Sequence, residues 1–401
     1  MHTHHVDTHP SRWRILSLLA LAELLGMSLW LVGSAVGPQL AEVLSLDTAQ
    51  VGGLTTAVQL GFVAGTAVSA LLNIADVVPG RRLFAVAAIL GAACNLPLAF
   101  TSNYVIALLS RFLTGACLAG VYPPAMKMAA TWFKARRGLA VGTVVGALTV
   151  GKALPYLARA LPDVTVANVT MLASGAAVAA ALLVALFYRD GPYEFPARPF
   201  SWTRAGDVLR SRNYRFATGG YLGHMFELYS YWTWIPAFLA AHEVARATAN
   251  SAPVDARLAA LIGFAVIAVG GAGCIWGGMV ADRIGRARLV NRAMAISGSC
   301  ALLIGFAFGQ SWWVMAPLAL VWGFFVIADS AQFSVLVTES VEPHAVGTAL
   351  TLQVSMGFLL TTVTIQLIPP LVGLVGWQWV FPVLAIGPFL GIASIRRLRS
   401  V

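Results

Sequence analysis

The sequence predicts an all-α integral membrane protein with twelve transmembrane helices in two pseudo-symmetric six-helix bundles. Of its 401 residues, 59% are hydrophobic and only 10% are charged, whereas a soluble globular protein carries about 25% charged residues. A helix needs about 20 residues to cross the hydrocarbon core, so twelve helices take about 240 residues and leave about 160 for all loops and tails. This arithmetic excludes an ordinary soluble enzyme and large domains outside the membrane.

Twelve apolar runs are long enough to span a bilayer. Seven contain no charge: 51–73, 83–101, 164–188, 258–281, 293–311, 345–368 and 374–395. Five contain an ionisable residue: 15–36, 104–128, 138–158, 216–241 and 312–337. We therefore expect a bundle over residues 15–188, a cytoplasmic linker over 189–213, a second bundle over 214–395, and tails at 1–14 and 396–401. The segment from Pro199 to Arg215 is a candidate for a short amphipathic helix along the inner leaflet, and a plain linker is the alternative.

The formal charge of +10 would suggest a nucleic-acid partner in a soluble protein. Here the arginines lie in short clusters between apolar runs, and cytoplasmic loops hold the excess of lysine and arginine. With the N-terminus inside, only Arg159, Arg246 and Arg257 fall in outer loops. We expect no nucleic acid, both termini in the cytoplasm, and a multi-pass chain in a bacterial-type inner (plasma) membrane.

The two halves of the sequence repeat one another. Glu23-Leu24 followed by Trp30 recurs 204 residues later (from position 23 to position 227) as Glu227-Leu228 followed by Trp234. Asp76 with Arg81 and Arg82 has its counterpart in Asp282 with Arg283 and Arg286. Two similar halves are typical of secondary transporters with a site at the repeat interface.

The run Gly278-Met279-Val280-Ala281-Asp282-Arg283-Ile284-Gly285-Arg286 closely resembles the cytoplasmic loop signature of the major facilitator superfamily. The resemblance extends from the first to the last predicted helix. It implies the fold of that superfamily and a gating role for Asp76, Arg81, Asp282, Arg283 and Arg286.

Two further motifs carry the resemblance. Arg111 followed by Gly115 and Gly120 is similar to the superfamily's second motif, in which the arginine is linked to proton coupling. Trp132-Phe133 followed by Arg136-Arg137-Gly138-Leu139-Ala140 is similar to bacterial members grouped with organic-anion and nitrate or cyanate permeases.

Ionisable residues inside the predicted spans are the strongest indication of function, because each costs at least about 2.5 kcal/mol at the bilayer centre. They recur on every third helix: Glu23, Arg111, His224, Glu227 and Asp329. If the fold is built from three-helix units, these residues face one water-accessible cavity. We expect Glu23 to lie near enough to Arg111 to pair, and His224 to form a protonation pair with Glu227.

We assign proton coupling to Glu23, Glu227 and Asp329, and substrate binding to Arg111, Lys152, His224, Tyr122, Tyr156 and Trp234. Three alternatives stay open. Lys152 can form a structural ion pair with Glu227 or Asp329, Asp329 can belong to a helix-to-helix hydrogen-bonding cluster, and the aromatic residues can serve packing. No catalytic residue, metal site or cofactor is expected. No phosphate-binding glycine loop occurs, so ATP does not drive the protein directly, and no His/Cys cluster with metal-ligand spacing occurs outside the histidine-rich N-terminal tail.

The function predicted is secondary active transport, coupled to protons, of a small anionic or zwitterionic metabolite by alternating access. Its partners are the substrate, the proton and the lipid bilayer, and we expect a monomer. One alternative is proton-driven efflux of a hydrophobic compound, and another is a membrane sensor or scaffold that keeps the fold without transport.

Overall fold

The computed structural model describes residues 9–133, 136–193 and 201–398. Over these residues the chain is helical, without a β-strand. Eleven of the described helices are long and apolar enough to cross a membrane. A twelfth, α11 (Arg212–Ala249), has 38 residues, but its middle carries His224, Glu227 and several aromatic side chains that lower its hydropathy. The predicted fold class is confirmed.

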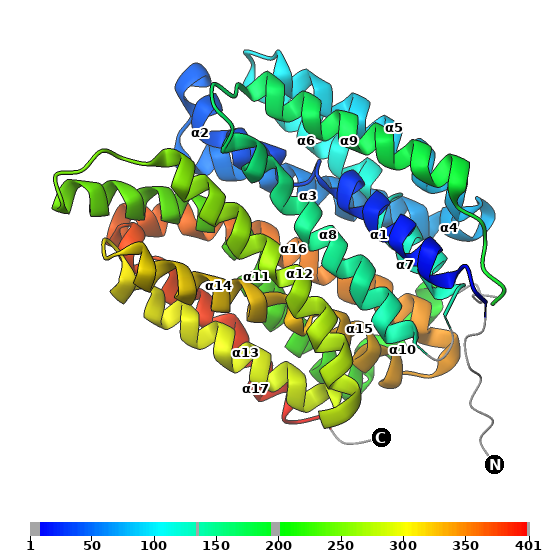
Figure 1. Ribbon diagram of the computed structural model, residues 1–401. Helices are drawn as coiled ribbons and strands as arrows, with labels where there is room; N and C mark the ends of the chain where they lie inside the picture. The colour runs from blue at the N-terminus through cyan, green and yellow to red at the C-terminus, as the bar shows by residue number, and fades with distance from the viewer. Residues whose placement is uncertain (1–8, 134–135, 194–200, 399–401) are drawn as a thin grey trace.

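The first six spans form the N-terminal half, which lies above the C-terminal half in Figure 1. Short breaks divide the first and the fourth of these spans, and a 3₁₀ turn ends the third span. The spans are α1 (Arg12–Met27) with α2 (Val32–Leu44), α3 (Thr48–Leu71), α5 (Gly80–Asn95) with η1 (Leu96–Ala99), α6 (Tyr104–Leu118) with α7 (Tyr122–Ala130), α8 (Arg137–Arg159) and α9 (Val166–Phe187). The short α4 (Ile74–Val77) lies between α3 and α5.

The C-terminal half repeats this pattern after the linker helix α10 (Trp202–Arg210). Its spans are α11, α12 (Ala256–Ile284), α13 (Arg286–Leu303) with η2 (Ile304–Ala307), α14 (Trp312–Ala328) with α15 (Ser330–Glu339), α16 (Val346–Val375), and η4 (Trp377–Trp379) with η5 (Phe381–Ala385) and α17 (Ile386–Ile395). A 3₁₀ turn, η3 (Pro343–Ala345), leads into α16.

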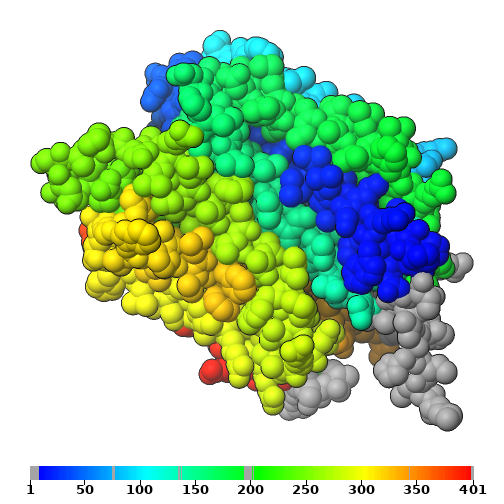
Figure 2. Space-filling model, viewed as in Figure 1, coloured from blue at the N-terminus to red at the C-terminus, as the bar shows by residue number. Residues whose placement is uncertain are grey.

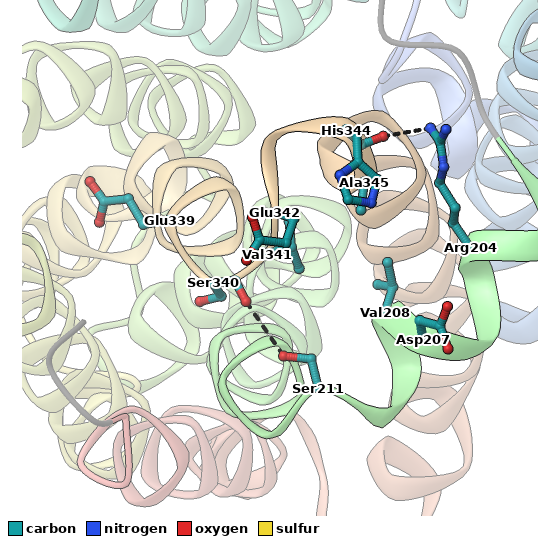
Figure 3. Close-up of a pocket in the computed structure, with 10 residues that line it drawn as sticks. All are labelled: Arg204, Asp207, Val208, Ser211, Glu339, Ser340, Val341, Glu342, His344 and Ala345. Carbon is teal, nitrogen blue, oxygen red and sulfur yellow. Dashed lines mark hydrogen bonds between the residues drawn. The ribbon is translucent and has the colours of Figure 1, made fainter.

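The linker helix α10 is fastened to the C-terminal half. The guanidinium of Arg204 donates to the carbonyl oxygen of His344 at 2.7 Å, and the hydroxyl of Ser211 lies 3.4 Å from the carbonyl oxygen of Ser340. Figure 3 shows both contacts at the edge of a hollow between α10, the end of α15 and η3. Helix α10 and the residue that follows it are therefore hydrogen-bonded to the C-terminal half.

One end of the bundle carries most of the arginines, and we call it the arginine-rich end. In Figure 1 the start of α1, the end of α17, α4 and α10 all lie toward this end, whereas α2 and the loop between α11 and α12 lie at the opposite, distal end. Both halves therefore begin and finish at the same end of the bundle.

Glycines set the spacing of the closest helix pairs. A Cβ at Gly61 or Gly115 would overlap the backbone of the partner helix, which brings α3 and α6 into direct contact. Gly146 on α8 and Gly271 on α12 face each other in the same way, and a Cβ on either would lie 2.7–2.8 Å from the other's carbonyl oxygen. Helices α8 and α12 belong to different halves, and their side chains meet along the boundary on the face shown in Figure 2.

Side chains close the distal end between the halves. The amide of Gln366 on α16 donates to the hydroxyl of Thr56 at 3.1 Å and to the carbonyl oxygen of Ala49 at 3.3 Å. The ring of Trp234 on α11 covers Gly52 on α3. These contacts join the first turns of α3 to the C-terminal half.

Candidate substrate and proton site

A buried ammonium group lies at the boundary between the two halves. Lys152 on α8 is 1% exposed, and its Nζ atom donates a hydrogen bond of 2.7 Å to the hydroxyl of Tyr229 on α11. The same atom lies 4.0 Å from the ring centroid of Trp30 and 4.7 Å from those of Tyr229 and Trp232. Cation–π attraction is strongest where water is excluded, so these aromatic rings stabilise the ammonium group.

The ion pair of Lys152 with Glu227 or Asp329, left open as an alternative to substrate binding, is not found among the described residues. Lys152 forms no ion pair with any acid among the described residues. The rings that surround its ammonium group take the place of a carboxylate. Because one of these rings comes from the N-terminal half and two from the C-terminal half, the contact joins the halves.

Aromatic side chains from both halves extend this site into a layer. The ring centroid of Phe62 on α3 lies 5.0 Å from that of Trp30 and 4.7 Å from that of Phe358 on α16. Phe358 also contacts Tyr229, with centroids 5.2 Å apart. Tyr122, at the start of α7, stacks on Phe62 at 6.4 Å. Of these rings, only Tyr122 belongs to the predicted binding set.

Glu23 on α1 lies close to Lys152. Helices α1 and α8 touch where Gly151 meets the carbonyl oxygen of Leu24, and this contact brings the charges of Glu23 and Lys152 near enough to interact. Glu23 is fully buried, and neither of its carboxyl oxygens has a hydrogen-bond partner among the described residues. One residue of the predicted proton-coupling set and one of the predicted binding set therefore lie near each other.

Arg111 does not pair with Glu23 as expected. Its guanidinium donates to the carbonyl oxygen of Leu29 and to the hydroxyl of Thr114, each at 2.9 Å, and to the side-chain oxygen of Asn95. Leu29 lies in the break between α1 and α2, where its carbonyl is free of the helix. Three neutral acceptors thus bind the two terminal nitrogens of a guanidinium that we expected an acid to balance.

His224 and Glu227 lie on the same helix but face different neighbours. The carboxyl oxygens of Glu227 accept hydrogen bonds from the indole of Trp322 at 2.7 Å and from the hydroxyl of Ser297 at 2.8 Å. Nδ1 of His224 lies 3.0 Å from a carboxyl oxygen of Asp329. The expected pairing of His224 with Glu227 is therefore not formed. Trp322 on α14 and Ser297 on α13 bind the two carboxyl oxygens of Glu227, and His224 faces Asp329 instead.

The remaining predicted binding residues also have definite places. Tyr156 is buried on α8, one turn from Lys152. The indole of Trp234 donates to the carbonyl oxygen of Ile365 at 3.0 Å and seals the distal end against Gly52. Trp234 thus closes the boundary instead of contacting the ammonium group.

The predicted gating residues lie at the arginine-rich end. Arg286 reaches Glu339 at 3.3 Å and Asp282 at 4.0 Å, both within the C-terminal half. Arg283 and Arg81 are exposed. Asp76 lies in α4, and its side chain is outside the described residues.

Several residues of the site were missed in the sequence. Arg111 donates a hydrogen bond to Asn95, and Glu227 accepts hydrogen bonds from Ser297 and Trp322. The aromatic layer is completed by Phe62 and Phe358. Asn95 is a lone amide in an otherwise apolar run, and that isolation was the one signal available. No comparable signal in the sequence distinguishes Phe62 or Phe358 from the other aromatic residues.

The sequence model of the Major Facilitator Superfamily, a protein family, matches residues 18–364 of this chain. The chain belongs to this superfamily. No curated protein matches it in sequence.

Solved structures agree with this membership at the level of the fold. A mutant of the nucleoside transporter NupG has 15% sequence identity and a TM-score of 0.72, over 96% of this chain and 100% of that one. A Major Facilitator Superfamily transporter, FucP, in the outward conformation has 15% identity and a TM-score of 0.66, over 98% of this chain and 100% of that one. The fold is therefore that of a membrane transporter.

Proposed function

We propose that this chain is a proton-coupled secondary transporter that moves a small anionic or zwitterionic metabolite by alternating access. The observation that carries the proposal is the buried ammonium group of Lys152, which lies between the halves and makes no direct ion pair with a carboxylate among the described residues. A buried charge that is not directly paired is costly. An anionic group on the substrate would supply that counter-ion.

The aromatic layer supports a small organic substrate. Binding sites for small molecules combine apolar and aromatic walls with a few placed polar groups. Here Trp30, Phe62 and Phe358 provide the walls, and Lys152 with the hydroxyl of Tyr229 provides the polar groups. The similarity of residues 132–140 to organic-anion permeases favours the same class of substrate.

Proton coupling follows from the charge balance of the site. One cation, Lys152, can neutralise one anion at a time, either the carboxylate of Glu23 or the anionic group of the substrate. When the substrate takes Lys152, the carboxyl of Glu23 is least costly in its protonated form, since no described residue donates a hydrogen bond to it. Substrate and proton then cross together.

Alternating access requires the halves to separate at one end at a time. Trp234, Gln366 and Gly52 close the distal end in this structure. We assign the arginine-rich end to the cytoplasm of a bacterial-type inner membrane, with both termini inside, following the excess of arginine there. The transporting unit is a monomer, because each monomer contains both halves of the site.

A second candidate is proton-driven efflux of a hydrophobic compound. The layer formed by Trp30, Phe62, Tyr229 and Phe358 favours it, because four rings in mutual contact form a large apolar cluster. The two candidates differ in their need for Lys152, since a neutral hydrophobic compound gains nothing from an ammonium group.

The decisive experiment uses purified protein in liposomes that are more alkaline inside. A thermal-shift screen of small carboxylates, amino acids, inorganic anions and lipophilic cations first selects the substrate, and its accumulation against a gradient is then measured. We expect Glu23→Gln to abolish uphill accumulation while exchange of substrate continues. Glu42→Gln is the control, since it makes the same change at an exposed position of α2 and should keep accumulation.

Two results would overturn the proposal. Uphill accumulation in the Glu23→Gln variant equal to that of the parent would remove the proton role of Glu23. Lys152→Met that still binds and moves an anionic substrate normally would remove the anion site and would favour the hydrophobic alternative.

A further inference from the structure

A basic hollow lies at the arginine-rich end, far from the ammonium site. Its volume is about 360 Å³, and it lies where α5 begins and α9 has just ended. The residues that line it are Pro79, Arg81, Arg82, Tyr188, Arg189 and Asp190. The apolar stretch of α5 therefore begins, and that of α9 ends, beside this hollow.

The charges around this hollow are unbalanced. Three arginines line it with a single carboxylate, and the guanidinium groups of Arg81, Arg82 and Arg189 form no ion pair or side-chain hydrogen bond with the described residues. Pro79 precedes α5 at the N-cap position and gives no side-chain cap, so the first N–H groups of the helix add positive potential. The hollow therefore attracts an anion with several oxygen acceptors, since arginine binds phosphate through two parallel hydrogen bonds.

An exposed apolar surface continues from the hollow along the same two helices. Val86 and Leu90 on α5 are 56% and 52% exposed, and Leu186 and Phe187 on α9 are 69% and 60% exposed. Arg82 and Val86 lie one turn apart, so they share a side of α5. Helices α5 and α9 pack against each other, and Figure 1 shows them side by side. A ligand that fits both features has a charged head and apolar tails.

We propose that this hollow binds the headgroup of an anionic phospholipid, with Arg82 and Arg189 on its phosphate and its acyl chains along α5 and α9. The apolar surface favours a lipid over a soluble phosphate compound, because only a lipid covers Val86 and Phe187 as well as the arginines. This site shares no residue with the ammonium site.

The test is native mass spectrometry of the full-length protein in detergent with phosphatidylglycerol, phosphatidylcholine or glycerol 3-phosphate added. We expect one retained molecule of phosphatidylglycerol, and binding about tenfold weaker in the Arg82→Gln, Arg189→Gln double variant, as for the loss of charge-assisted hydrogen bonds. Arg288→Gln is the matched control. Arg288 is exposed at the third position of α13, as Arg82 is at the third position of α5, so its loss should change binding less than twofold.

Each outcome decides the proposal. Equal retention of phosphatidylglycerol by the parent and the double variant would overturn it, as would equal retention of phosphatidylcholine and phosphatidylglycerol by the parent. Glycerol 3-phosphate that binds as tightly as the lipid would show that the site takes a soluble phosphate, and the lipid proposal would fail. Thermal melting without lipid checks that the double variant is folded. If it is not, the single Arg189→Gln variant gives the comparison, since that side chain is exposed.

Discussion

Replacing Tyr229 by phenylalanine removes one oxygen atom from the contact that Lys152 makes across the two halves. The phenylalanine ring still offers its face to the ammonium group, so the cation–π contact at 4.7 Å persists. The hydrogen bond of 2.7 Å to the hydroxyl is lost. Because the bond joins α8 to α11, its loss weakens the state in which the halves meet and leaves each half unchanged.

The size of the effect follows from that single bond. A hydrogen bond to a charged group contributes about 1.5–3 kcal/mol, and a factor of ten in population corresponds to about 1.4 kcal/mol. Tyr229→Phe should therefore shift the population of molecules with an open distal end roughly tenfold to a hundredfold.

Labelling of a cysteine at Thr56 reports the opening, because the hydroxyl of Thr56 accepts the bond from Gln366 that closes the distal end. The four native cysteines are first replaced by alanine, and an impermeant maleimide is added to protein in liposomes. Tyr214→Phe is the control. Tyr214 lies on the same helix, but its hydroxyl donates to the carbonyl oxygen of Ala349 within the C-terminal half. Labelling rates for Tyr229→Phe within twofold of those for Tyr214→Phe would refute the reasoning.

Three further predictions follow from contacts outside that site. Gly271→Val should lower the melting temperature in detergent and abolish transport, since a Cβ there would lie 2.8 Å from the carbonyl oxygen of Gly146; Gly175→Val, which meets open space on α9, should do neither. Arg111→Lys should lower the melting temperature by losing hydrogen bonds at the break in α1, while the pH dependence of transport stays that of the parent. Glu243 lies beyond the apolar part of α11, and an arginine one turn away holds its pKa at about 2. It therefore stabilises the fold above its ordinary pKa of about 4.3, and the gap in melting temperature between the parent and Glu243→Gln should close as the pH falls through about 2; a constant gap would count against this assignment.

The spans and the repeat could be predicted because they depend only on the order of apolar and charged residues along the chain. Uncharged runs of membrane length and the return of Glu23-Leu24 as Glu227-Leu228 need no knowledge of which helices touch. Membership of the superfamily followed from the loop signature, and the family match over residues 18–364 confirms it.

The surroundings of each buried charge could not be predicted in the same way. His224 and Glu227 are three residues apart, which turns their side chains by about 60° around the helix, enough to place one against Asp329 and the other against Trp322. The break between α1 and α2 frees the carbonyl of Leu29 for Arg111. Neither the facing of a helix nor a break in it is visible in a hydropathy pattern.

The reciprocal approach of Gly146 and Gly271 decides how the two halves can move. Along that line the two backbones are in contact, and the short side chains of Val150 and Thr149 on α8 lie beside them against Gly271 and Gly270. Tilting one half against the other at this pair displaces these short side chains. The boundary can thus let the halves tilt, while the hydrogen bonds of Arg111 tie the bend of the first span to its own half.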